Sequence, residues 1–414
     1  MDKLADSVRR TAEPAFSFKE YSVEEVAARV EKLEAAYDRE TDKLLRPLTT
    51  DEEAFIRHEI VRSKADFMYW ALRYAFLKDK HASLIRFAPT AVQDLLLQRI
   101  AKEEYSALIE KSGDGILLMV LKARQLGVST ISDIIIAHRT FFYGNITGLI
   151  ASDIDDHTEN LYGMVFRVFT SLPWWMKPRS QDPQRDYKKF NKLLSFSDQD
   201  SVIRFVSSNN MAGGDSGQEK GSMGTGQTLH LAHLSELALW VNPGQIDDAL
   251  MPSIPMSPRT FAIFESTAKG RGNWWHIAWD QGKRGLGRRK PVFIPWYTDP
   301  QTYKLPAPVN WEPSTEALQH AASVKEKSVP WVGQTIILSK DQLYWWERTR
   351  AEYIDGRKLN KFLAEYAADD LEAFQNTTLG VFPAELIEGM RRRAAKTPFL
   401  LEIKPRMDMN ADAS

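Results

Sequence analysis

The chain contains no cysteine among its 414 residues. This absence excludes disulfide bonds, thiolate-bound zinc and a cysteine nucleophile. No apolar run reaches the roughly 18 residues that a membrane-spanning helix requires, so no membrane partner is expected. Residues 1–16 also lack the apolar core of a secretory signal. The sequence therefore predicts a protein that is not exported.

A strong charge of either sign is missing too, because the formal net charge is only −1. No overall field draws the chain onto nucleic acid, so any such contact has to come from local basic runs. Two runs qualify: KRGLGRRK at 283–290 and RRR at 391–393. Runs of this kind are more often solvated surface than binding site. With 43% hydrophobic and 26% charged residues, the composition is that of an ordinary globular protein.

The apolar patterns divide the chain into four expected regions. Residues 1–65 are polar with helical spacing and predict an N-terminal helical region. Residues 66–300 alternate β-rich and helical runs, which predicts an α/β core with a mainly parallel sheet flanked by helices. Residues 301–385 predict a small helical lid or linker, and 386–414 a tail. Within the core, strands are expected at 115–121, 146–152, 228–234 and 259–265, with a hairpin in 192–208.

The stretch ILLMVLKARQLGVST at 116–130 has the outline of a nucleotide-binding P-loop, an apolar strand followed by a tight turn and a helix. The usual pattern is G-x-x-x-x-G-K-S/T, whose backbone N–H groups and lysine surround the phosphates. Here Val128 occupies the lysine position and Ser129 the hydroxyl position. The cations lie earlier in the loop, at Lys122 and Arg124. Upstream of the loop, Gln93 has an amide that can both donate to and accept from an adenine edge. The residues expected to bind ATP are Gln93, Lys122, Ala123, Arg124, Gln125, Leu126, Gly127, Val128, Ser129 and Thr130.

A second segment, TLHLAHLSELALW at 228–240, is an apolar strand that ends in Ser235 and Glu236. In P-loop enzymes a glutamate at this place polarises the attacking water, and an aspartate before it supports Mg²⁺. Glu236 suits the first role. Ser235 replaces the aspartate and would reach Mg²⁺ weakly or through water, beside Ser129. The alternative is that Glu236 only caps the next helix. His233, on the same strand, is expected to pack and not to bind a metal.

A third segment, FAIFESTAKGRGNWW at 261–275, ends its strand with Ser266, Thr267 and Ala268. Small hydroxyl residues there can sense the γ-phosphate and couple its loss to movement, although such residues are also common at strand ends for packing reasons. Before the second segment lies a loop at 208–227 rich in glycine, serine and asparagine. A loop of this length inside a compact domain is unusual unless it has a function.

In this order, the segments resemble the ATPase of a large terminase subunit, the motor that packages DNA into tailed-phage capsids. The resemblance covers roughly residues 65–390 and rests on KARQLGVST, HLSELALW, ESTAKGRGNWW and FLAEYAADDLEAFQNTTLGVFP. It implies an ASCE-type, RecA-like P-loop ATPase that uses ATP and Mg²⁺. The implied partners are double-stranded DNA, a portal protein, a small terminase subunit and further copies of the chain in a pentameric ring. The implied location is the host cytoplasm and, transiently, the procapsid portal.

The resemblance also implies features that this sequence matches only in part. It places a basic catalytic residue of a neighbouring subunit in the glycine-rich loop, where Lys220 is the only cation, and Arg124 acting within its own subunit is the alternative. It implies a C-terminal nuclease of ~150 residues, for which too few residues follow Phe382, so no nuclease activity is expected. Finally, Val128 and Ser235 favour a non-hydrolysing scaffold, whereas Lys122, Ser129 and Glu236 favour a motor. Another P-loop DNA translocase or helicase is the remaining alternative.

Overall fold

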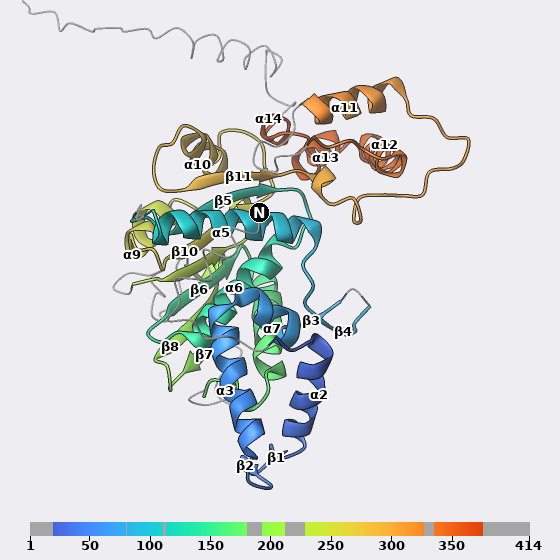
Figure 1. The fold of residues 1–414 in the computed structure, drawn as a ribbon. Helices are drawn as coiled ribbons and strands as arrows, with labels where there is room; N and C mark the ends of the chain where they lie inside the picture. The colour runs from blue at the N-terminus through green and yellow to red at the C-terminus, as the bar shows by residue number, and fades with distance from the viewer. Residues whose placement is uncertain are drawn as a thin grey trace, which may run out of the picture.

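The computed structural model describes residues 20–79, 81–110, 113–179, 193–211, 228–326 and 335–375. At its centre lies one seven-stranded sheet (Figure 1). Its strands are β5 (Ile116–Lys122), β6 (Thr147–Ser152), β7 (Leu193–Phe196), β8 (Ser201–Ser207), β9 (Leu231–Leu234), β10 (Phe261–Ser266) and β11 (Lys290–Ile294). In space the order is β11-β5-β10-β9-β6-β8-β7. All neighbouring pairs are parallel except β7 with β8, which confirms the mainly parallel α/β P-loop fold expected from the sequence.

The strands expected at 115–121, 146–152, 228–234 and 259–265 are present as β5, β6, β9 and β10, and the expected hairpin is β7 with β8. The sequence did not indicate β11. Its first residue belongs to the basic run at 283–290, and its second is Pro291, which removes a backbone donor. Proline is tolerated there because β11 is the outer strand of the sheet.

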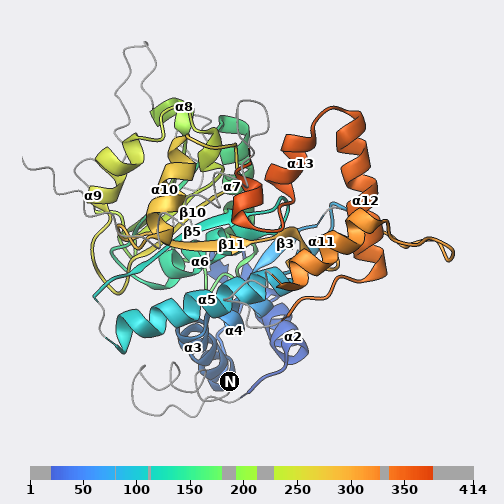
Figure 2. The ribbon, with the colours of Figure 1, turned by 90° about the horizontal axis from the view of Figure 1, so that it is seen from above.

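Helices cover both faces of this sheet, as Figures 1 and 2 show. The helices of the described chain are α2 (Val23–Glu34), α3 (Thr50–Ala65), α4 (Phe67–Tyr74), α5 (Ala91–Leu108), α6 (Val128–Phe142), α7 (Asp155–Ser171), α8 (Ser208–Met211), α9 (Met251–Ser253), α10 (Trp274–Lys283), α11 (Thr315–Glu326), α12 (Lys340–Asp355), α13 (Leu359–Glu365) and α14 (Asp370–Ala373). Shorter elements are the turns η1 (Leu237–Leu239), η2 (Ile246–Leu250) and η3 (Trp296–Thr298), and the hairpins β1 (Tyr37–Asp38) with β2 (Lys43–Leu44) and β3 (Phe76–Lys78) with β4 (Leu84–Arg86).

Strand β5 explains why both faces need covering, since all seven of its residues are buried. Successive side chains of a strand point to opposite faces. Leu118 and Val120 accordingly pack in the cluster that includes α5 and α6. Leu117 and Met119 pack in a second cluster with the aromatic helix α10. A strand that is buried on both faces has a continuous apolar sequence, and residues 116–121 show this pattern.

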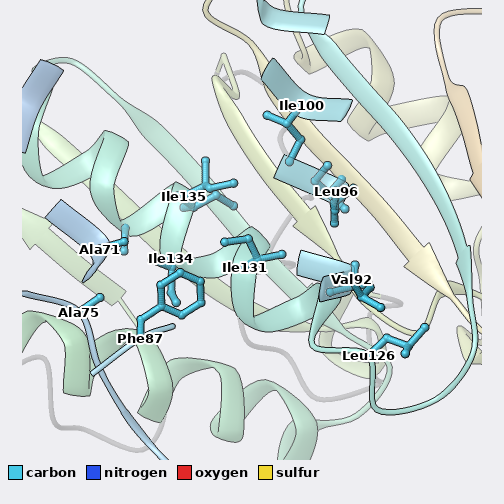
Figure 3. Packing of buried hydrophobic residues seen from close by; sticks show 14 of the residues in the cluster. Ala71, Ala75, Phe87, Val92, Leu96, Ile100, Leu126, Ile131, Ile134 and Ile135 are labelled. Carbon is cyan, nitrogen blue, oxygen red and sulfur yellow. The ribbon is translucent and has the colours of Figure 1, made fainter. Parts of the chain in front are cut away.

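The helix that follows the P-loop-like turn is held by α5. Residues Val92, Leu96 and Ile100 lie four apart along α5 and therefore share one helix face. Figure 3 shows these side chains near Ile131 of α6 and Leu126 of the turn, and all belong to one buried cluster. This packing orients the N-terminus of α6 at the carboxyl end of β5.

Helices α11, α12 and α13 gather beside the sheet, away from α8 and α9 (Figure 2). Aromatic side chains join them to the segment after β11. Trp345 of α12 lies 5.0 Å from Trp296 and 4.9 Å from Tyr303 between ring centroids.

No helix in the described ranges has both the length and the apolar character needed to cross a bilayer.

Candidate functional site

The turn between β5 and α6 requires a glycine at its last position. Gly127 has φ of 70°, a left-handed value that favours glycine. A Cβ there would lie 2.5 Å from Nε2 of Gln93. The amide nitrogen of Gln93 donates to the carbonyl oxygen of Gly127 at 2.9 Å, and its oxygen accepts from the backbone of Thr90 at 3.0 Å. The side chain of Gln93 therefore links α5 to the backbone of the loop. The contact of Gln93 with adenine stays a prediction.

The lysine of this site is Lys122, at the end of β5. Val128, which occupies the usual lysine position, is buried in the core. Lys122 is also largely buried, and its Nζ lies 3.2 Å from Oε1 of Glu236 and 3.1 Å from Oε2 of Glu265. Burial lowers the pKa of Lys122, but the two carboxylates more than offset this and hold the pKa above its usual value. Lys122 is therefore a cation at neutral pH.

Glu265 on β10 is the residue that sequence reasoning missed. Its side chain is fully buried, and its Oε1 accepts hydrogen bonds from Oγ of Ser129 at 2.6 Å and from Oγ of Ser235 at 2.7 Å. Burial raises the pKa of Glu265, but Lys122, His233 and Ser129 more than offset this and hold the pKa well below its usual range. The available signal was one charge inside the apolar run FAIFES, because buried charges require partners.

His233 and Asp133 extend the charged cluster into the core. His233 is buried, as expected of a packing residue, but it is also paired with two carboxylates. Its Nδ1 lies 2.6 Å from Oδ1 of Asp133, and its Nε2 lies 3.4 Å from Oε1 of Glu265. Burial lowers the pKa of His233, but Asp133 and Glu265 more than offset this and raise the pKa to about 9. His233 therefore favours its protonated form, whereas burial raises the pKa of its partner Asp133.

The substitution Asp133→Asn is expected to lower the free energy of unfolding, at the lower end of roughly 3–5 kcal/mol, because it leaves a buried charge short of a partner. Urea denaturation measures this change. The matched control is Glu53→Gln, which removes an exposed pair with Arg57 and should cost about 0–1 kcal/mol. A cost for Asp133→Asn as small as the control's would contradict the charged state of His233.

Glu236 does not act as a helix cap. It precedes the short turn η1, yet its side chain makes no capping hydrogen bond there. Its φ of 54° is unusual for a residue with a side chain, and such strained positions concentrate at functional sites. The side chain is one-quarter exposed and contacts Lys122. The capping alternative is therefore wrong, and Glu236 is held at the rim of the site.

A cavity of about 440 Å³ lies beyond the carboxyl ends of three adjacent strands. Ser152, Ser235 and Thr267, which end or follow β6, β9 and β10, line it together with Glu236 and Arg124. Ligands of open α/β sheets bind at this edge, where loops leave the strands. The cavity thus adjoins Glu236, and Arg124 is the residue of the P-loop-like turn that lines it.

The three residues expected to sense the γ-phosphate occupy different environments. The hydroxyl of Ser266 accepts from the backbone N–H of Ala238 at 3.1 Å and so links β10 to η1. Thr267 lines the cavity, and Ala268 is buried in the cluster of α10. Their coupling role stays a prediction. Lys220, the expected basic residue of a neighbouring subunit, lies outside the described residues.

Arg124 contacts the C-terminal helices, which the sequence did not indicate. Its Nη1 lies 3.0 Å from Oε1 of Glu365 in α13, and its backbone N–H donates to the carbonyl oxygen of Glu365 at 3.3 Å. The hydroxyl of Tyr303 donates to the backbone oxygen of Arg124. The guanidinium is about half exposed, at 49%. The loop is thereby attached directly to α13 while its cation remains accessible.

No family model and no curated protein matches this sequence. Among solved structures, the large terminase of bacteriophage HK97 is similar, with 12% identity and a TM-score of 0.44. That match covers 74% of this chain and 55% of the terminase, so the chain spans about half the length of that protein. The ATPase domain of the Thermus phage P74-26 large terminase is 16% identical, with a TM-score of 0.37. This second match covers 64% of this chain and 92% of that domain.

Proposed function

We propose that this chain is an ATPase that moves double-stranded DNA, as the large-terminase motor of a phage does. The observation that carries the proposal is the position of Lys122. This residue brings together the P-loop-like turn, the glutamate after β9 and the carboxylate of β10 at one edge of the sheet. Residues 122 and 236 are 114 positions apart, so the sheet itself builds the contact. A scaffold that only docks on DNA or on a capsid would have no need of this arrangement.

The proposed site binds ATP at the loop 123–127 and the N-terminus of α6. Backbone N–H groups and the helix dipole there favour phosphate oxygens. Lys122 provides the cation that Val128 lacks, and Arg124 provides a second, accessible one. Glu236 accepts the proton of the attacking water, which is general-base catalysis.

The residues around Ser129 suit Mg²⁺, because hydroxyl and carboxylate oxygens are the donors that this ion prefers. Within the described ranges, no group of three or more His, Asp or Glu side chains is placed to hold a metal. Mg²⁺ in nucleotide sites is commonly bound through one or two protein ligands together with the phosphates of the nucleotide. When bound, Mg²⁺ neutralises charge on the phosphate oxygens. Ser129 would hold it, with Ser235 nearby.

Exchange of partners links nucleotide binding to the rest of the molecule. Lys122 is paired with Glu236, and Arg124 with Glu365. A phosphate that attracts both cations weakens both pairs, which frees Glu236 for water and loosens α13 from the loop. Ser266 would transmit a further change, because it holds the segment after Glu236. The lid formed by 301–385 would then move the DNA.

The partners in this proposal follow from the resemblance to terminases. They are duplex DNA, a portal protein, a small terminase subunit and other copies of the chain in a pentameric ring. In such a ring, Lys220 is the candidate for the basic residue that acts on the ATP of a neighbouring subunit, and Arg124 acting within its own subunit is the alternative. The site of action would be the host cytoplasm, at the procapsid portal.

The direct test is binding and turnover of ATP by the chain, measured with and without duplex DNA. Calorimetry reports binding, and phosphate release reports turnover. Hydrolysis that rises with duplex DNA supports the proposal. A folded chain that binds no ATP in the presence of Mg²⁺ would contradict it, and tight binding without any turnover would favour the scaffold.

DNA binding is expected to depend steeply on salt and weakly on sequence, because a motor must hold every sequence through its phosphates. For six phosphate contacts, affinity should fall about 10³-fold between 50 and 200 mM salt. Fluorescence anisotropy with two duplexes of equal length and unrelated sequence measures both effects. Binding that strongly prefers one duplex and barely responds to salt would rule out sequence-independent binding through the DNA phosphates.

A further inference from the structure

The proposed ATPase site lacks one of its expected carboxylates. The residue before Glu236 is Ser235, where an aspartate usually supports Mg²⁺. The hydroxyl of Ser235 donates to Oε1 of Glu265 at 2.7 Å, and the hydroxyl of Ser129 donates to the same atom at 2.6 Å. The two serines expected at the metal therefore converge on a single carboxylate from another strand.

The register of the sheet explains how Glu265 reaches this place. Strand β10 lies between β5 and β9. Glu265 is level with Val120 of β5, and the preceding Phe264 is level with Leu234, the last residue of β9. Glu265 is thus level with position 235, one residue beyond the end of β9. A carboxylate on β10 can therefore occupy the space that an aspartate on β9 would fill.

The second carboxylate oxygen of Glu265 faces a cation. Its Oε2 is buried and accepts no hydrogen bond from the residues that the structure describes. Among these residues, Oε2 forms an ion pair with Nζ of Lys122 at 3.1 Å. A carboxylate oxygen can accept more than one hydrogen bond, so Oε2 keeps capacity for a donor besides the Lys122 ammonium. Mg²⁺ in nucleotide sites commonly keeps several waters, which are such donors.

We propose that Glu265 supplies the carboxylate that supports Mg²⁺ in this site, in place of the aspartate absent at position 235. The inference rests on the proposed ATPase function and adds the residue that makes its metal site complete. Ser129 and Ser235 orient the Glu265 carboxylate through Oε1, and Oε2 is directed to Lys122. Glu265 is in this view a positioning residue for the ion, while Glu236 acts on water.

The competing explanation is that Glu265 only balances the buried charges of Lys122 and His233. A counter-ion affects stability, whereas a metal-supporting residue also affects affinity for the ion. The experiment measures binding of Mn²⁺, as a paramagnetic substitute for Mg²⁺, to the chain with ATP present, by electron paramagnetic resonance. For Glu265→Gln the apparent Mn²⁺ affinity is expected to fall roughly 10- to 100-fold. An unchanged affinity would overturn the proposal and leave the counter-ion role.

A charge-relocation variant separates the metal from the fold. The double variant Ser235→Asp with Glu265→Gln returns the carboxylate to β9 and keeps the net charge. Its Mn²⁺ affinity is expected to recover most of what Glu265→Gln loses, and failure to recover in a folded protein would count against the proposal. If Glu265→Gln does not fold, Glu265→Asp keeps the charge but shortens the side chain, and native affinity in that variant would overturn the proposal.

The same measurements keep this inference distinct from the function on which it rests. If the native chain binds no ATP, the ATPase proposal itself fails. If the native chain binds ATP with Mn²⁺ and Glu265→Gln does so equally well, only the role of Glu265 fails. Circular dichroism and thermal unfolding of each variant establish that the comparison is made between folded proteins.

Discussion

Glu236→Gln is expected to stop ATP turnover while leaving ATP binding intact. The amide has nearly the shape of the carboxylate but cannot take a proton from water, so kcat should fall roughly 10²- to 10⁴-fold. The variant also removes one partner of Lys122, which leaves this cation freer to meet phosphate. The affinity for ATP should therefore be unchanged or higher. Single-turnover phosphate release measures the first effect and calorimetry the second.

The control for this variant is Glu316→Gln, an isosteric change at an exposed pair with Arg350 on the C-terminal helices. It should leave both turnover and binding at native values. Turnover by Glu236→Gln at the native rate would show that another group activates the water. The strained backbone at position 236 would then need a different explanation.

Lys122→Met is expected to weaken both ATP binding and the fold. Methionine keeps much of the apolar stem but removes the ammonium, and a lost hydrogen bond to a charged phosphate lowers affinity by roughly 10- to 100-fold. The fold suffers because Glu265 loses its cation inside the core, which costs about 3 kcal/mol of unfolding free energy. Calorimetry with ATP and urea denaturation measure the two losses separately.

Lys283→Met is the matched control, because this lysine is 44% exposed and pairs with Asp370 away from the cavity. It should cost about 0–1 kcal/mol and leave ATP affinity unchanged. If Lys122→Met binds ATP as tightly as the native chain, the phosphate cation is not Lys122. Arg124, half exposed on the same loop, would then be the residue to replace.

Local sequence was sufficient for six of the seven strands of the sheet and for part of the site. The six consecutive apolar residues 116–121 predicted β5, and Gly127 followed by a helical pattern predicted the turn into α6. The position of Glu236 directly after an apolar strand predicted that this residue belongs to the site. These features are readable because they depend on neighbours in the chain: side-chain alternation, the left-handed backbone that glycine favours, and the start of a helix. The sequence did not predict strand β11, because its proline is acceptable only in an edge strand. Which strand lies at the edge is decided by the assembly of the whole sheet.

The sequence by itself determined that a strand, a tight turn and a helix would form a P-loop-like corner, and that a glutamate would follow another strand. Only the tertiary structure decided which charges meet there. The inserted strand β10 brings Glu265 to within 2.6 Å of Ser129, 136 positions away, and α13 brings Glu365 to Arg124, 241 positions away. Strand order and helix docking depend on how the whole apolar core closes, and no local pattern encodes the neighbour of a strand. The buried ionisable side chains of Lys122, His233, Asp133 and Glu265 become a network only because that closure excludes water from all of them.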